Sequence, residues 1–135
     1  MSPEVDGGER VTHGVGVGFA DGDLLTVLES NAVESFDDLG FGVVTMDRTG
    51  VVIGYNADES QRSGLSRERV LGRDFFIEVG PCTNNHLIAE RYRAAAELDD
   101  ELDYVFTFRI RPTPVRLRLL AAPGSPRQYL VVRSR

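Results

Sequence analysis

Three side chains between positions 55 and 82 have types and spacing that could hold an anionic organic ligand. Tyr55 and Glu59 lie four residues apart at a predicted strand-to-helix junction, and Cys82 is the only cysteine of the chain. If one helical turn separates Tyr55 from Glu59, both side chains can face one pocket. A phenol and a protonated carboxyl could then donate hydrogen bonds to one buried anionic oxygen, while the thiol holds the other end of the ligand.

Cys82 alone admits several interpretations: a buried core thiol, a catalytic nucleophile, a redox thiol or a cofactor attachment point. Base rates favour the core thiol. A cysteine-dependent enzyme would need a base, and His86 is the candidate, but no oxyanion loop or third orienting group is recognisable. Tyr55 could equally be a strand-end aromatic with a wet hydroxyl, and Glu59 an exposed helix residue. The joint presence of Tyr55, Glu59 and Cys82 favours the interpretation that Cys82 attaches a cofactor. If the far end of that cofactor is a buried phenolate, it needs hydrogen-bond donors, and burial beside an anion keeps a carboxyl protonated so that it can donate.

The segments that carry these residues resemble the photoactive yellow protein family. The matching segments read YNADE from Tyr55, GRDFF from Gly72 and VGPCT from Val79, within a resemblance that runs from about Phe36 to Arg133. The resemblance implies a PAS-fold blue-light photoreceptor rather than an enzyme. It also implies p-coumaric acid (4-hydroxycinnamic acid) as the chromophore, bound as a thioester on Cys82.

Roles for individual residues follow from the resemblance. Tyr55 matches the tyrosine that donates to the chromophore phenolate, and Glu59 matches the buried, protonated glutamate. Ser63 stands where the family usually has a threonine that orients the tyrosine, and the backbone N–H of Cys82 matches the donor to the chromophore carbonyl. The other predicted chromophore-binding positions are Phe75, Pro81, Thr83, Tyr104, Phe106, Leu65 and Ile110.

Two of these positions depart from the family pattern. Leu65 replaces the arginine that usually shields the phenolate end, and Arg62 is a nearby candidate to take its place. Ile110 replaces the methionine that assists thermal return to the dark state, which predicts slow recovery. The implied mechanism is chromophore isomerisation, proton transfer from Glu59 and partial unfolding, because an unpaired buried carboxylate costs several kcal/mol.

Composition and charge narrow the other possibilities. The chain has 135 residues, 41% of them hydrophobic and 27% charged, with a net charge of -6, which predicts one folded domain. An acidic chain is a poor nucleic-acid binder. One cysteine and two distant histidines, His13 and His86, exclude an internal disulfide and disfavour a zinc site.

Without a secretion signal or an apolar run of about 20 residues, we expect a cytoplasmic protein with no membrane contact. We further expect an unknown downstream signalling protein as partner, and a monomer or weak homodimer. The alternative to a photoreceptor that binds p-coumaric acid is a PAS sensor or interaction module with another ligand or none.

The elements that position these residues are predicted from apolar periodicity and turn residues. Two strands, several short helices, one longer helix and three strands indicate an α+β domain, a PAS fold with a five-stranded antiparallel sheet flanked by helices. Arg116 and Arg118 are expected to point outward to water. The predicted division is a flexible extension over 1–22 and a photosensor domain over 23–135, with cap helices in 23–40 and the PAS core in 41–135. Strands are predicted at 41–47, 51–55, 102–111, 115–119 and 129–133, and the longest helix from 84 or 85 to about 98.

Overall fold

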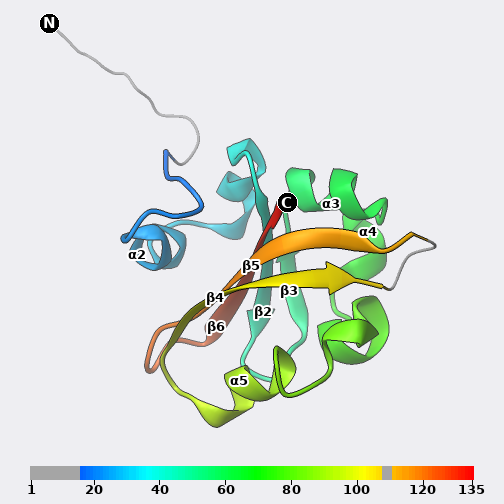
Figure 1. Ribbon diagram of the computed structural model, residues 1–135. Helices are drawn as coiled ribbons and strands as arrows, with labels where there is room; N and C mark the ends of the chain where they lie inside the picture. The colour runs from blue at the N-terminus through cyan, green and yellow to red at the C-terminus, as the bar shows by residue number, and fades with distance from the viewer. Residues whose placement is uncertain (1–15, 108–110) are drawn as a thin grey trace, which may run out of the picture.

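A five-stranded antiparallel sheet forms the centre of the protein, as predicted. The computed structural model describes residues 16–107 and 111–135. The strand order is β3-β2-β6-β5-β4, so β2 lies between β3 and the last strand, β6 (Figure 1). The strands are β2 (Gly42–Asp47), β3 (Val52–Tyr55), β4 (Leu98–Phe106), β5 (Thr113–Ala121) and β6 (Arg127–Ser134).

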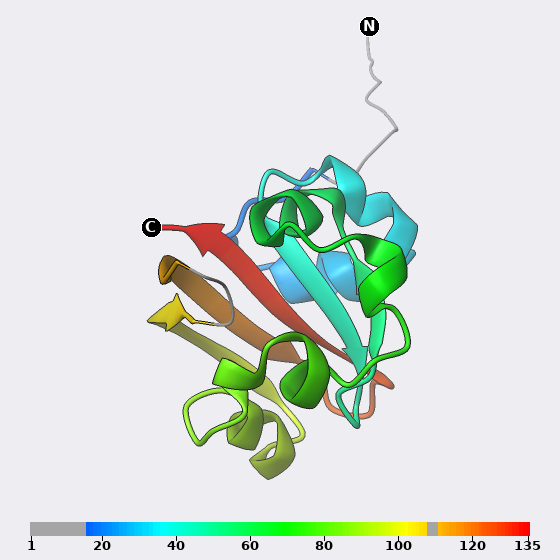
Figure 2. The ribbon, with the colours of Figure 1, turned by 90° about the vertical axis from the view of Figure 1, so that its right-hand side faces the viewer.

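Short helices cover the sheet on both sides. The segment between β3 and β4 packs on one face, whereas α2 and the 3-10 turn η1 lie toward the other (Figure 2). None of the helices in the described part of the chain combines the length and apolar character that crossing a membrane requires. The helical elements are α2 (Leu24–Glu29), η1 (Val33–Asp38), α3 (Ala57–Ser63), α4 (Arg67–Val70), the π-helical turn η2 (Phe75–Val79), the 3-10 turn η3 (Pro81–Thr83) and α5 (Ala89–Ala94).

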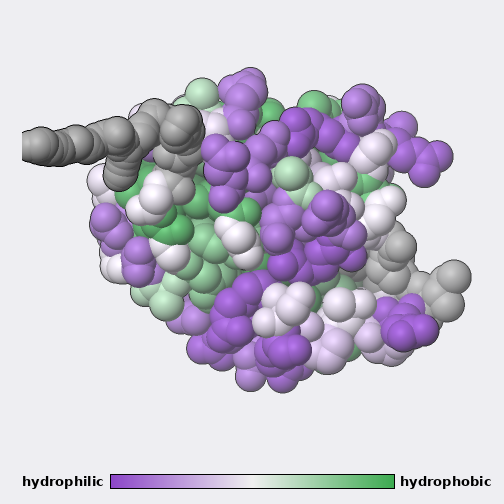
Figure 3. Space-filling model, turned by 90° about the horizontal axis from the view of Figure 1, so that it is seen from above, coloured by the Kyte–Doolittle hydropathy of each residue, from purple (hydrophilic) through white to green (hydrophobic). Residues whose placement is uncertain are grey.

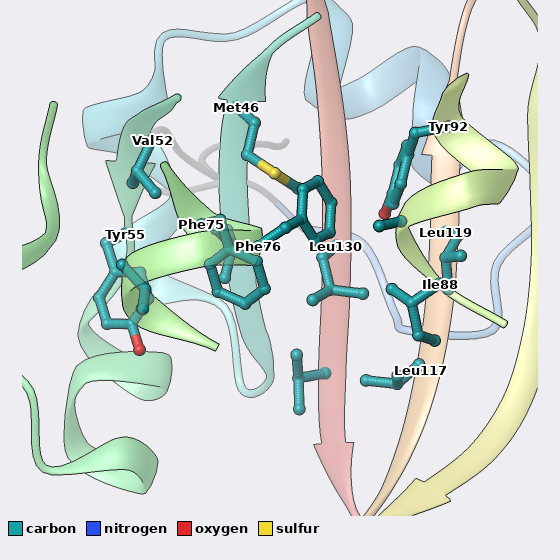
Figure 4. Packing of buried hydrophobic residues seen from close by; sticks show 14 of the residues in the cluster. Met46, Val52, Tyr55, Phe75, Phe76, Ile88, Tyr92, Leu117, Leu119 and Leu130 are labelled. Atoms are coloured by element: carbon teal, nitrogen blue, oxygen red, sulfur yellow. The ribbon is translucent and has the colours of Figure 1, made fainter. Parts of the chain in front are cut away.

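Two apolar clusters hold these layers together. Neighbouring residues of one strand belong to different clusters, as Val43 and Val44 do, because side chains alternate between the faces of a strand. One cluster lies on the face that the segment between β3 and β4 covers, and it is called the helical-face cluster below. It contains Phe75, Phe76 and Tyr92 (Figure 4). The second cluster, on the opposite face, contains Phe19, Leu24, Leu28, Phe36, Leu39, Phe41, Val43, Leu120, Tyr129 and Val131.

The prediction of a long helix from residue 84 or 85 to about 98 is wrong. The structure has a short α5 over Ala89–Ala94, and Leu98 is the first residue of β4. Acidic residues dominate the first half of β4, and their low strand propensity concealed it in the sequence. Arginines of β5 compensate: Arg116 pairs with Glu101 and Asp103 across the two strands.

Arg118 was predicted to face water, and this prediction is wrong as well. Its side chain is only 7% exposed and forms a two-pronged ion pair with Asp99 at 2.9 and 3.0 Å. Its Nη1 also donates to the carbonyl oxygens of Phe19 and Asp21 at 2.9 and 2.7 Å. The N-terminal segment therefore closes over this arginine. Residues 1–15 lie outside the described residues, so the extension over 1–22 and the other domain boundaries stay predictions.

Candidate functional site

The site begins at Asn56, which lies between β3 and α3 and is the N-cap of α3. Its buried Oδ1 accepts hydrogen bonds from the backbone N–H of Glu59 at 3.1 Å and of Val43 at 2.9 Å. Its Nδ2 donates to the carbonyl oxygens of Phe36 and Phe41, both at 2.9 Å. An asparagine at this position caps the helix. Because its amide also ties the helix start to β2 and the N-terminal cap, Asn56 fixes where the side chains of α3 lie.

Tyr55 and Ser63 form the first pair of the site. The Tyr55 hydroxyl donates to Ser63 Oγ at 2.8 Å, and both residues are buried. Figure 4 shows the Tyr55 ring inside the core with its oxygen directed toward α3. Ser63 Oγ also accepts from the backbone N–H of Leu65 at 3.1 Å. One hydroxyl thus positions both the tyrosine and the turn after α3, where Gly64 adopts a left-handed φ of 76°.

Replacing Ser63 with alanine should lower the free energy of unfolding by about 1 kcal/mol, because the hydrogen bond from the Tyr55 hydroxyl to Ser63 Oγ is lost. Ser63→Thr keeps the hydroxyl and is the matched control. Urea unfolding of Ser63→Ala, Tyr55→Phe and the double variant measures the coupling between the two side chains. Strictly additive effects would contradict the pairing.

Glu59 is the second key group, and its carboxyl is buried with its side chain only 3% exposed. Arg62 Nη1 lies 3.1 Å from Glu59 Oε1, while Arg62 Nη2 lies 2.7 Å from Asp58 Oδ2. Burial raises the pKa of Glu59 from 4.5 to about 7, although the positive charge of Arg62 and its hydrogen bond act to lower it. Near neutral pH this buried carboxyl can therefore exist as an acid or as a carboxylate.

Cys82 lies in η3, is partly exposed and packs against the helical-face cluster. Its carbonyl oxygen accepts hydrogen bonds from the Tyr104 hydroxyl at 2.6 Å and from Asn85 Nδ2 at 3.0 Å. Asn85 Nδ2 also donates to the Tyr104 hydroxyl at 2.7 Å. These bonds fix the backbone that carries the thiol and leave the sulfur out of the network. His86, the candidate catalytic base, is exposed.

The other predicted positions differ in their surroundings. Phe75 and Phe106 are buried, and the Phe106 ring meets Tyr104 edge to face at 6.2 Å between centroids. Thr83 is buried and donates its hydroxyl to the Gly80 carbonyl at 2.6 Å, whereas Pro81 is exposed. Ile110 lies outside the described residues, so its effect on recovery stays a prediction.

A cavity of about 320 Å³ lies beside Leu65, the position that departs from the family pattern. Leu65 is partly buried against the helical-face cluster and also lines this cavity. The other lining residues are Arg69, Val70, Arg73, Glu78 and Val79. Arg69 and Arg73 thus line the same cavity as Leu65, which stands where the family usually has an arginine. They are further candidates, besides Arg62, to take the place of that arginine.

Sequence reasoning missed part of the supporting structure. The YNADE motif contains Asn56 but does not by itself reveal its capping role, although the residue before a helix is where a capping asparagine is expected. Arg62, the candidate to take the place of the missing arginine, donates a hydrogen bond to Glu59, and its role at the phenolate end stays a prediction. Within the described residues, no group of three or more His, Cys, Asp and Glu side chains could hold a metal ion.

Comparison with known proteins gives a consistent result, although no family model matches the chain. The photoactive yellow protein of Rhodothalassium salexigens is 30% identical over 118 residues, which cover 85% of this chain and 94% of that protein. The photoactive yellow protein of Halochromatium salexigens is 30% identical over 109 residues, 78% of this chain and 87% of that protein.

Solved structures agree with these relatives. The photoactive yellow protein domain of the sensor histidine kinase Ppr from Rhodospirillum centenum superposes with a TM-score of 0.74 at 35% identity, covering 82% of this chain and all of that one. The PAS domain of an HTR-like protein from Haloarcula marismortui reaches a TM-score of 0.60 at 17% identity, covering 82% of this chain and 96% of that domain. The second similarity concerns the fold alone.

Proposed function

This chain belongs to the photoactive yellow protein family and has the PAS fold, and from that premise we propose that it is a blue-light receptor carrying p-coumaric acid as a thioester on Cys82. The observation that carries the proposal is the buried carboxyl of Glu59, with a pKa raised to about 7, on the same short helix as the Ser63 hydroxyl that holds Tyr55. A carboxyl that stays protonated near neutral pH can donate a hydrogen bond to an anionic ligand.

The residues present fit such a chromophore chemically. Cys82 is a partly exposed free cysteine that packs against an apolar cluster, which suits an acyl group with an aromatic ring. Tyr55 and Glu59 would hold the ionised phenol, and Phe75, Tyr104 and Phe106 would surround the ring. Attachment forms a bond from Cys82 Sγ to the carboxyl carbon of an activated p-coumarate, whose leaving group departs while the thiol proton passes to solvent.

The chromophore, when bound, supplies absorption of blue light and isomerisation about its double bond. The chain supplies the proton. Because Glu59 Oε1 accepts a hydrogen bond from Arg62, the protonated oxygen of the carboxyl is Oε2. Loss of this proton converts a neutral buried group into a carboxylate, which changes the electrostatics at the start of α3.

Signalling is proposed to follow from this change of charge. The α3 cap at Asn56 also holds the carbonyl oxygens of Phe36 and Phe41, so a shift of α3 would be felt in the N-terminal cap. Partial unfolding of that cap would expose a surface to a separate signalling protein in the cytoplasm. The related domain from Rhodospirillum centenum belongs to a sensor histidine kinase, which supports signalling to a partner, and this role requires no catalysis by the chain itself.

Incubating the purified chain with p-coumaric anhydride should yield a yellow protein that bleaches under blue light and recovers in the dark. Its intact mass should increase by one p-coumaroyl group in place of one hydrogen. The visible spectrum and the mass are measured on the same sample. A colourless protein of unchanged mass would refute the photoreceptor assignment and leave a PAS sensor or interaction module with another ligand or none.

A further inference from the structure

Arg62 contacts three groups that come from two different parts of the fold. Its Nη1 lies 3.1 Å from Glu59 Oε1 and its Nη2 lies 2.7 Å from Asp58 Oδ2, both on α3. Its Nε donates to Ser134 Oγ, at the end of β6, at 3.2 Å. The guanidinium therefore joins the buried carboxyl of the site to the last strand of the sheet.

This cluster is sheltered from solvent. The side chains of Arg62 and Glu59 are 15% and 3% exposed, and that of Asp58 is 27% exposed. The end of the molecule that carries α3 and the C-terminus has a largely hydrophilic surface over its centre (Figure 3). Interactions between charges that are screened little by water are stronger than those of exposed pairs.

Gly42, at the start of β2, leaves space for the Glu59 carboxyl. A Cβ placed on Gly42 would collide with Glu59 Oε1 and would lie 2.8 Å from Arg62 Nη1. Gly42 pairs with Val132 of β6, two residues before Ser134. A side chain at position 42 would therefore have to displace the carboxyl, the guanidinium or both.

The charges of this cluster depend on the state of Glu59. A guanidinium keeps its positive charge at all ordinary pH values. While Glu59 is protonated, Arg62 is balanced by Asp58. When Glu59 loses its proton, the same cation faces two carboxylates and the cluster carries one net negative charge. In this arrangement the ionised Glu59 has Arg62 as a charged partner.

We propose that Arg62 is the counter-ion of Glu59. Its guanidinium compensates the negative charge that the carboxylate carries after the glutamate has given up its proton. This inference rests on the proposed function, in which Glu59 is the proton donor. Arg62 is thereby a positioning residue: it limits the structural change that the buried charge would otherwise drive, and its bond to Ser134 carries the change to the end of β6.

The matched control is already present in the chain. Glu90 and Arg93 have the same three-residue spacing on α5 and form an ion pair at 2.7 Å, but their side chains are 56% and 51% exposed. Arg93→Gln removes the same charge as Arg62→Gln without affecting a buried partner. Arg62→Lys keeps the positive charge and tests whether charge or guanidinium geometry matters.

The decisive measurement is a dark titration of the chain without chromophore, by NMR of carboxyl carbons, with the Glu59 signal assigned from Glu59→Gln. Arg62→Gln should raise the Glu59 pKa by about 1–3 pH units, because an opposite charge at this distance lowers a carboxyl pKa by that amount. Arg62→Lys should raise it less, and Arg93→Gln should leave it unchanged. Equal Glu59 titrations in wild type and Arg62→Gln would overturn the inference.

The same variants can then be loaded with p-coumarate and illuminated. Arg62→Gln should show faster light-induced hydrogen exchange in the N-terminal cap than wild type, because its buried carboxylate lacks a counter-ion, whereas Arg93→Gln should match wild type. Identical exchange in all three would also count against the role of Arg62. Failure of the proposed function appears separately, as absence of colour after reconstitution, and leaves the dark titration interpretable.

Discussion

Replacing Cys82 with serine should abolish covalent attachment of p-coumarate while leaving the protein folded. The serine hydroxyl is a far weaker nucleophile than a thiolate, so no acyl transfer is expected under the conditions that colour the wild type. The known hydrogen bonds at this position involve the backbone carbonyl, which accepts from Tyr104 and Asn85, and serine preserves them. We therefore expect complete loss of visible colour and of the mass increase, with an unchanged far-UV circular dichroism spectrum.

His86→Ala is the companion variant, because it separates a photoreceptor from a thiol enzyme. His86 is exposed, and attachment to Cys82 does not require it, so this variant should take up the chromophore like the wild type. Colour in the Cys82→Ser protein would show that binding is not through this sulfur. Thiol-dependent turnover that disappears in His86→Ala would favour the enzyme alternative.

Replacing Glu59 with glutamine should remove a large pH dependence of stability. The pKa of Glu59 is about 7 in the folded protein against an ordinary 4.5. A carboxyl with a raised pKa binds more protons in the folded state, so its contribution to stability is complete below pH 4.5 and is lost as the pH rises to about 7. The expected loss is about 3 kcal/mol, a large part of the roughly 5–15 kcal/mol typical of a small domain.

The measurement is urea unfolding of both proteins at pH 4 and at pH 8. The stability of Glu59→Gln relative to wild type should increase by about 3 kcal/mol between the two pH values. Glutamine can still accept the hydrogen bond from Arg62, so the local structure is kept. Glu90→Gln, in the exposed pair with Arg93, should show little such difference. Parallel pH profiles for wild type and Glu59→Gln would contradict the buried, protonated carboxyl.

The same substitution bears on the light reaction. In a reconstituted protein, glutamine keeps a hydrogen-bond donor but has no proton to release. The absorption should shift and the light-induced structural change should be smaller. An unchanged visible spectrum would argue against a contact between residue 59 and the chromophore.

The architecture could be predicted from the sequence because its signals are local. Alternating apolar residues and turn residues predict the strands at 41–47, 51–55, 115–119 and 129–133. The order of elements indicates an antiparallel α+β sheet, which the structure confirms. The prediction was wrong where local preference and tertiary contacts disagree. The acidic run from Leu98 to Asp103 lacks strand propensity, yet it forms the first part of β4, where Arg116 of the neighbouring strand pairs with Glu101 and Asp103.

The family, the fold and the candidate positions of the site can be predicted from the amino-acid sequence, because residue type and spacing at Tyr55, Glu59 and Cys82 are visible along the chain. Which groups become partners follows from the packing of the folded chain. Asn56 joins α3 to β2, Gly42 makes room for a carboxyl, and Arg62 reaches Glu59 and Ser134. These contacts depend on how the sheet brings residues 42, 62 and 134 together, and burial of a charge depends on packing from every side, which no local pattern of residues records.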